Sequence, residues 1–250
     1  MTRAARRVWL LYPVFFCSGA AGLGYQIAWA RMFTAGLGHE LPATLAVVGA
    51  FMGGMAIGAE IFDKFATTLS DHWPGRATSP GPRPATLYAI LEVTIGIWAL
   101  VTTALIPTFN RVALHAIGID PSPLRHWTDA FLLPLLALLP ATAAMGATLP
   151  AMARFISPLS AGGQCIGAIY ATNTMGAVAG IFASTIVLVP ALGLRESVWC
   201  FAILNLICGV VVYFIARRPD FAETAVPAGS DRQSARAPVM TAFPSHRACF

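Results

Sequence analysis

The residues with the clearest chemical potential are charged side chains inside long apolar segments. Glu92 lies within the run LYAILEVTIGIWAL, and Glu60 lies four residues before Lys64 near the end of another apolar run. A charge at membrane depth is costly, so each one indicates either a structural ion pair or a site for a proton or a substrate. The spacing of Glu60 and Lys64 predicts an interfacial ion pair on one helix face.

Glu92 has no basic neighbour in the sequence. The topology derived below places it at about the same depth as Arg154. We therefore expect these two residues to form an ion pair, because pairing would remove two isolated charges from the hydrocarbon. The alternative is that Glu92 binds a proton or a substrate, and the sequence leaves both open.

Three uncharged polar side chains also lie in apolar segments. Gln26 follows the glycine-rich stretch GAAGLG, Asn173 comes one helical turn after Tyr170, and Asn205 lies in the last apolar run. Hydrogen bonds between helices made by such groups contribute roughly 0.6–2 kcal/mol each. We expect a structural hydrogen bond for Asn205. Gln26, Tyr170 and Asn173 are candidate ligand-binding residues, because Gln26 and Asn173 each neighbour a tyrosine and a glycine-rich segment.

The elements that must position these residues are membrane helices. Of the 250 residues, 57% are hydrophobic and 11% are charged, and the mean hydropathy is +0.69. Soluble domains have about 25% charged residues, so the composition excludes a soluble globular protein and predicts an all-α, polytopic integral membrane protein. The apolar runs predict about six transmembrane helices, at 8–37, 42–69, 85–110, 127–156, 163–189 and 195–216. Arg3, Arg6 and Arg7 before the first run resemble a signal sequence, but apolar sequence resumes at 27–37, which favours an uncleaved helix.

The basic residues set the orientation of these helices. With the amino terminus in the cytoplasm, twelve of the sixteen Lys and Arg residues are cytoplasmic and four are on the other side. This bias predicts cytoplasmic termini. The net charge of +5 is explained by these scattered residues, so no nucleic-acid partner is expected. The chain therefore divides into a transmembrane domain, 1–217, and a polar cytoplasmic tail, 218–250, predicted to be disordered. The Pro- and Gly-rich stretch 70–84 is predicted to be a loop, and 113–117 a short interfacial turn.

Glycines and prolines shape the expected packing. Gly49 and Gly53, Gly54 and Gly58, and Gly176 and Gly180 are each four residues apart, a spacing that lets membrane helices approach closely. A shift of 123 residues aligns the pair at 30–31 with 153–154, and Gly53 with Gly176, which suggests two inverted three-helix repeats. Pro134, Pro140 and Pro150 predict a kinked or broken fourth helix.

No catalytic, metal or cofactor site is expected. The five histidines share no metal-ligand spacing, and the five cysteines form no CxxC pair. Gly19, Gly22 and Gly24 do not form a dinucleotide-binding pattern, and no strand precedes them.

Six segments in order resemble a known family. They are GAAGLGYQIAWAR (19–31), AFMGGMAIG (50–58), LYAILEVTIGIWAL (87–100), MGATLPAMAR (145–154), IYATNTMGAVAG (169–180) and LVPALGLR (188–195). Together they look like the membrane domain of bacterial proteins in which a major-facilitator-like part is fused to a spermidine-synthase-like part. The resemblance covers nearly the whole chain up to Arg217.

The resemblance implies a half-transporter-like bundle in the bacterial inner membrane. It also implies that Gln26, Arg31, Glu92, Tyr170 and Asn173 match family-typical positions. The aminopropyltransferase-like domain that usually follows is not in this sequence, so we expect no enzymatic activity from this chain. The segment 60–73 departs from the short Gly-Arg-Leu-Ala-Asp-like stretch usual in the family, which puts a conventional gating role for this loop in doubt.

Two functions of different class follow as expectations. The first is a carrier or binding component for a small, polyamine-like molecule, with Glu60, Glu92, Arg154 and the polar residues above as candidate ligands; six helices would then need a second copy to complete a pathway. The second is a non-transporting subunit that anchors or scaffolds a separate enzyme or a larger membrane complex. Both functions place the chain in contact with the lipid bilayer.

Overall fold

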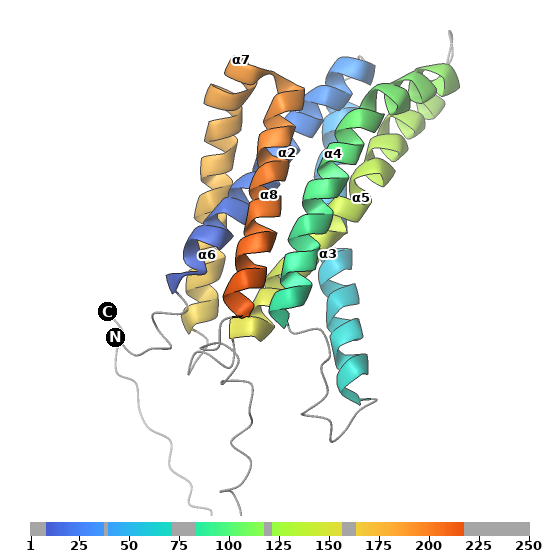
Figure 1. Cartoon of the computed structure of the whole chain (residues 1–250). Coiled ribbons are helices and arrows are strands. Elements are labelled where there is room, and N and C mark those ends of the chain that lie inside the picture. Colours follow the sequence, from blue (N-terminus) through green and yellow to red (C-terminus); the bar gives the residue numbers. More distant parts are fainter. Residues whose placement is uncertain (1–8, 38–39, 72–83, 118–121, 157–163, 218–250) are drawn as a thin grey trace, which may run out of the picture.

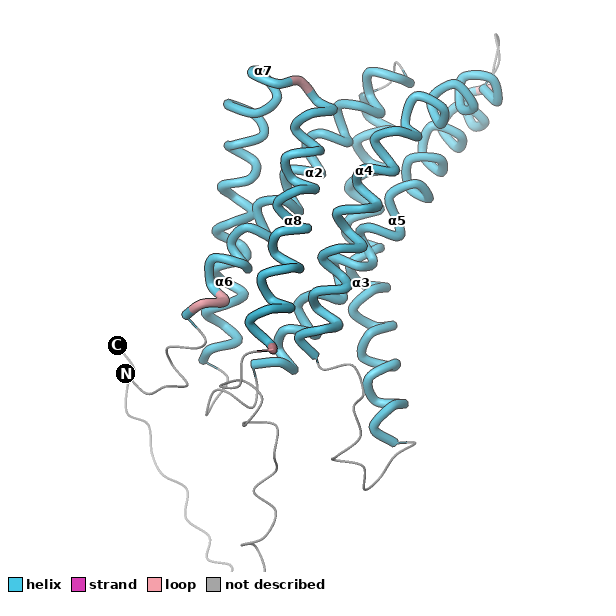
Figure 2. The backbone as a smooth tube through the Cα atoms, viewed as in Figure 1, coloured by secondary structure: helices cyan, strands magenta, loops and turns pink. Residues whose placement is uncertain are grey.

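The protein is a bundle of long helices in which helices successive in the chain run in opposite directions (Figure 1). A computed structural model describes residues 9–37, 40–71, 84–117, 122–156 and 164–217. The long helices are α2 (Tyr12–Leu37), α3 (Glu40–Asp71), α4 (Pro84–Ile117), α5 (Pro123–Ile156), α6 (Gln164–Phe182) and α8 (Leu194–Ala216). The start of α2 and the end of α8 lie at one end of the bundle, and α7 (Val189–Leu192) lies at the other (Figure 1). Within the described ranges the chain is helical almost throughout and has no strands, as Figure 2 shows, so the predicted all-α class is confirmed.

Five of these helices are long and apolar enough to cross a membrane. They comprise the segments Leu41–Lys64, Pro84–Val112, Trp127–Ile156, Ile166–Leu192 and Leu194–Ala216. Helix α2 does not meet this measure although its 26 residues could span the hydrocarbon. Its Ala21, Tyr25, Ala28 and Trp29 are fully buried against other helices, so this helix depends on protein contacts more than on contact with lipid. The chain is a multi-pass membrane protein, with α2 inside the bundle.

The helix boundaries agree with the sequence prediction except in a few places. The predicted turn at 113–117 is wrong, because α4 continues through this segment to Ile117. The start of the predicted loop is helical, since α3 extends to Asp71. The rest of that loop up to residue 83, and the predicted disordered tail from 218, lie outside the described residues.

The proline-rich helix is continuous. Of the predicted kink or break in α5, the break is wrong, since Pro134, Pro140 and Pro150 all lie inside one helix of 34 residues. Side chains supply hydrogen bonds around Pro140: Trp98 Nε1 of α4 donates to the carbonyl oxygen of Ala137 at 2.9 Å, and the Thr142 hydroxyl faces two carbonyl oxygens of the preceding turn at 3.1 Å. Carbonyl groups near a proline in a membrane helix can be satisfied by such neighbours, which allows the helix to continue.

The irregular helix is instead the fifth one. A π-helical segment, η2 (Ala183–Leu188), joins α6 to α7. Pro190 follows this segment and has no N–H to donate to the carbonyl group of Ile186. In a regular α-helix the proline ring would also crowd that carbonyl oxygen. The wider π-helical turn just before the proline relieves this conflict. Gly193, with φ of 94°, then separates α7 from α8. This backbone conformation favours glycine, which explains the sharp reversal here.

Glycines allow three helix pairs to approach closely: α2 with α6, α3 with α5, and α4 with α8. A Cβ atom at Gly176 or Gly180 would overlap backbone atoms of α2, and one at Gly58 would overlap the carbonyl oxygen of Ala143 on α5. The predicted small-residue packing is therefore confirmed for the pairs Gly54/Gly58 and Gly176/Gly180. It is not confirmed for Gly49/Gly53, because a Cβ at Gly49 would make only ordinary contacts at 3.7 Å and one at Gly53 would meet nothing within 4 Å.

The helix pairs match the pattern expected of two repeated halves. If the repeats correspond, α2 is equivalent to α5, α3 to α6, and α4 to α8. The contact between α2 and α6 is then equivalent to the contact between α5 and α3, and the contact between α4 and α8 is equivalent to itself. The contact of Gly180 with Ala20 then corresponds to that of Gly58 with Ala143. Ala20 and Ala143 are 123 residues apart (143 − 20), whereas Gly58 and Gly180 are 122 apart (180 − 58). These two contacts match the 123-residue shift drawn from the sequence to within one residue.

Two glycines of α3 provide a matched test of this packing. Replacing Gly58 with Ala should lower the stability by about 1–3 kcal/mol, because the methyl group would force α3 away from Ala143. Replacing Gly53 with Ala should be neutral or slightly stabilising, since the site is open and Ala favours helix. Thermal unfolding of the purified variants in mild detergent would measure both. Equal melting temperatures for the two variants would contradict the close α3–α5 contact.

Candidate functional site

A hydrogen-bonded carboxyl group lies at the centre of the bundle. Glu92 of α4 has no solvent exposure. The Ser18 hydroxyl of α2 donates to Glu92 Oε1 at 2.6 Å, and Asn205 Nδ2 of α8 donates to Oε2 at 2.6 Å. The Tyr25 hydroxyl donates in turn to Asn205 Oδ1 at 3.2 Å. One carboxyl group therefore connects three helices, with both of its oxygens bonded.

Local glycines bring these side chains together. Gly96 lies one turn after Glu92, and a Cβ there would be 3.0 Å from the carbonyl oxygen of Ala202 on α8. Gly209 lies one turn after Asn205, and a Cβ there would be 2.9 Å from the carbonyl oxygen of Ala89 on α4. The two helices can therefore approach on both sides of the Glu92–Asn205 hydrogen bond, which keeps that bond short.

A second buried hydroxyl group lies beside the carboxyl group. Tyr88, one turn before Glu92, is fully buried and stacks on Phe15 with ring centroids 5.3 Å apart. Its hydroxyl is close to the Glu92 carboxyl group, yet it makes no well-aligned hydrogen bond to any described residue. A buried hydroxyl without a partner is unfavourable, so this group has unused hydrogen-bonding capacity beside the carboxyl group.

A cavity of about 390 Å³ lies next to this network. Its volume falls in the range of small-molecule sites. Helices α2, α3, α4, α5, α6 and α8 all contribute to its wall, and Gly22 leaves space because a Cβ there would meet nothing within 4 Å. The polar side chains in the wall are Ser18, Thr148, Tyr170, Asn173, Thr174 and Asn205. Two of them, Ser18 and Asn205, hold the Glu92 carboxyl group, so Glu92 lies directly behind the wall.

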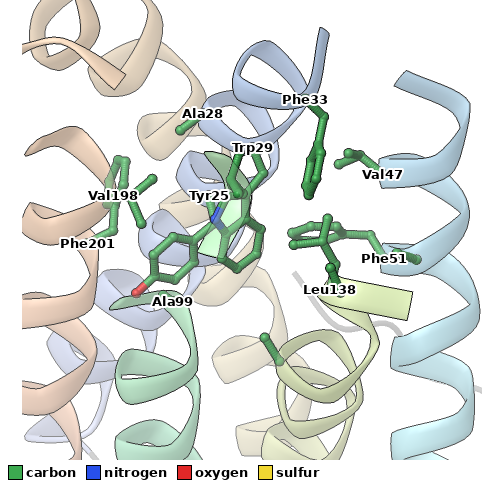
Figure 3. Close-up of a cluster of buried hydrophobic side chains, with 14 of the residues drawn as sticks. Tyr25, Ala28, Trp29, Phe33, Val47, Phe51, Ala99, Leu138, Val198 and Phe201 are labelled. Carbon is green, nitrogen blue, oxygen red and sulfur yellow. The ribbon is translucent and has the colours of Figure 1, made fainter. Parts of the chain in front are cut away.

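An aromatic layer closes the bundle on one side of the cavity. Tyr25 and Trp29 of α2 stack with ring centroids 4.8 Å apart, and Phe201 of α8 and Phe51 of α3 pack against them, as Figure 3 shows. On α2, Tyr25 and Trp29 lie farther than Ser18 from the end of the bundle where α2 starts. On α8, Phe201 lies farther than Asn205 from the same end. The cavity therefore lies on the side of the aromatic layer that faces the start of α2 and the end of α8.

The structure does not form the expected Glu92–Arg154 ion pair. Arg154 Nη2 instead lies 2.9 Å from Asp63 Oδ1 on α3, and both side chains are partly exposed. Charge counting estimates only depth along the membrane, whereas pairing also depends on which way each side chain faces around its helix. The predicted ion pair of Glu60 and Lys64 is confirmed at 3.0 Å, with both side chains largely exposed.

The sequence candidates fall into two groups. Tyr170 and Asn173 line the cavity, and Glu92 lies behind its wall. The others lie away from it: Gln26 is half-buried outside the wall, Arg31 and Glu60 are exposed, and Arg154 pairs with Asp63.

The sequence reasoning missed Ser18 and assigned Asn205 only a structural role. Ser18 directly precedes the first glycine of the opening glycine-rich stretch, where close helix packing was already expected. A small hydroxyl residue beside such a contact can reach a neighbouring helix, which was the available signal. Within the described ranges, no three His, Cys, Asp or Glu side chains are grouped so as to hold a metal ion.

Comparisons with protein-family models, with curated proteins and with solved structures give no match. The site is therefore interpreted from its geometry.

Two serines test whether the hydrogen bonds of this network stabilise the bundle. Replacing Ser18 with Ala should lower the free energy of unfolding by about 1 kcal/mol, because one oxygen of Glu92 loses its donor. Replacing Ser184 with Ala should have no destabilising effect, since this buried hydroxyl has no hydrogen-bond partner among the described residues. Denaturation in mixed detergent micelles would give both values. A larger loss for the Ser184 variant would contradict this assignment.

Proposed function

We propose that this membrane protein is a carrier or binding component for a small polar molecule. The observation that supports it best is the 390 Å³ cavity in the bundle, with polar side chains from four helices in its wall and a buried carboxyl group behind it. A bundle built only for anchoring gains nothing from such a cavity, because buried polar groups and voids both reduce stability. The proposal assigns binding to this chain and no enzymatic step.

The charge of the site favours a cationic substrate. Glu92 is the one acidic side chain at the cavity in the described part of the chain, and no arginine, lysine or histidine lines the wall there. An ammonium group in the cavity could be held by the oxygens of Asn173 and Tyr170 and balanced in charge by the Glu92 carboxylate behind the wall. A polyamine-like cation fits this chemistry, and it is also the class that the resemblance to the spermidine-synthase-like proteins implies.

We also propose that the chain lies in a bacterial inner membrane with both termini in the cytoplasm. Twelve of its sixteen Lys and Arg residues then lie on the cytoplasmic side. In this orientation the aromatic layer separates the cavity from the outer side.

The orientation predicts the behaviour of a reporter fused after Phe250. A green fluorescent protein fused there should fluoresce, because it folds in the cytoplasm, and an exported alkaline phosphatase at the same position should be inactive. The same two reporters inserted after Gly193, in the sharp reversal at the opposite end, should give the reverse result. Phosphatase activity at Phe250 would contradict the proposed orientation.

A second candidate function is a subunit that anchors or scaffolds another protein. The segment Ile166–Leu192 is the least enclosed of the five spans, with 17% of it buried against 39–44% in the others. Its exposed apolar side chains include Met175, Phe182 and Ile186. Lipid or a partner helix would cover this face equally well, so the cavity remains the stronger observation.

Two glutamates distinguish these functions. Vesicles containing the purified protein should take up labelled spermidine, and replacing Glu92 with Gln should reduce the initial rate at least about tenfold, because a removed ion pair at a buried site is worth more than 1.4 kcal/mol. Replacing Glu60 with Gln should leave the rate unchanged, because this exposed ion pair lies away from the cavity. Gel filtration would verify that both variants remain folded.

The scaffold function would be favoured by a different result. If no polyamine enters or binds, and the chain copurifies in fixed ratio with another protein, then the cavity does not serve a substrate. Mass spectrometry after affinity purification in mild detergent would identify that partner.

A further inference from the structure

In the described part of the chain, no basic side chain pairs with Glu92 to balance its charge. Both of its oxygens accept hydrogen bonds, but the donors, Ser18 and Asn205, are uncharged. An ionised carboxyl group buried in an apolar bundle costs much more than two neutral hydrogen bonds return. Since no described residue supplies it, the neutralising partner we consider is a proton or a cation in the adjoining cavity.

The groups that surround the carboxyl group support this view. The titratable side chains facing it are Cys17 and Tyr25 of α2, Tyr88 of its own helix, and Cys208 of α8. All four are neutral when protonated, and no basic side chain of the described residues is among them. Arg154, the partner expected from the sequence, is already paired with Asp63. Among the described residues, none can change the charge balance at Glu92, which leaves exchange with the cavity.

Ser18 provides the route for this exchange. Its hydroxyl is bonded to Glu92 Oε1 and also lines the cavity. A hydroxyl group both donates and accepts, so it can take the proton of the carboxyl group while passing its own proton to water in the cavity. Asn205, the other bonded residue in the wall, has an amide that cannot relay a proton in this way.

Tyr88 allows both charge states to be satisfied. Its buried hydroxyl is close to the carboxyl group and has no aligned partner. A phenol can rotate to donate to the ionised carboxyl group or to accept from the protonated one. The unused capacity at this position is what a site with two protonation states requires.

We propose that Glu92 is a proton–cation exchange site, which carries a proton when the cavity is empty and releases it when a cationic substrate binds. In this step the O–H bond of the Glu92 carboxyl group breaks, the proton passes through Ser18 to water in the cavity, and the ammonium group of the substrate balances the carboxylate. The total charge of the buried site stays the same throughout. This inference rests on the proposed function and adds that binding of the substrate is coupled to release of a proton.

Infrared difference spectroscopy of the full chain in lipid would test the exchange, with spermidine as the probe. Addition of spermidine should remove the carbonyl stretching band of one protonated carboxyl group, and a pH-sensitive dye should detect about one proton released per bound spermidine. The band change should be absent in Glu92→Gln and unchanged in Glu60→Gln. In Glu92→Asp, spermidine should remove a carboxyl band that lies at a different frequency from the wild-type band. This response keeps the test informative if the Gln variant fails to fold.

The outcomes separate this inference from the proposed function. If labelled spermidine binds to the wild-type protein but neither the band nor the dye responds, the exchange is wrong and the binding function stands. If the band is lost equally in Glu92→Gln, another carboxyl group is responsible and the assignment to Glu92 is overturned. If spermidine does not bind at all, both proposals fail for this class of cation.

Discussion

The burial of the Glu92 carboxyl group is the constraint on which the rest of the bundle depends. A carboxyl group with no exposure must have hydrogen-bond donors, and these come from Ser18 on α2 and Asn205 on α8. Moving either helix by one turn would displace its donor by about 5.4 Å and leave an oxygen unsatisfied. The network therefore fixes the register of three helices that are far apart in sequence.

Glycines in α2 show how close packing and an open cavity coexist in one helix. A Cβ at Gly19 would overlap α6 at Asn173, and one at Gly24 would overlap the ring of Phe201 on α8. Gly22, which lies between them, faces open space in the cavity wall. The first two positions hold the neighbouring helices close, and the third keeps side-chain atoms out of the space that those helices enclose. The same residue type therefore has two opposite uses within six residues.

The sequence could predict what depends on composition and on the helical period. Apolar runs located the helices, small residues located the close contacts, and the isolation of Glu92 in an apolar run identified the central group. It could not predict what depends on the direction in which a side chain points around its helix. For this reason Glu92 was paired with Arg154 rather than with Asn205, and Gly53 was expected at a close helix contact although it faces open space.

The hydrogen bonds of Glu92 link its charge state to the relation between the two halves of the bundle. The bond to Ser18 lies within the first half, α2 to α4, whereas the bond to Asn205 crosses to the second half, α5 to α8. The cavity is likewise lined by both halves, with Phe51 and Ile95 from the first and Met145 and Asn173 from the second. A protonated carboxyl group is a weaker acceptor than a carboxylate, so adding a proton weakens the Asn205 bond between the halves. Protonation of Glu92 therefore weakens the Asn205 hydrogen bond between the halves, and this bond would have to change if the cavity rearranged.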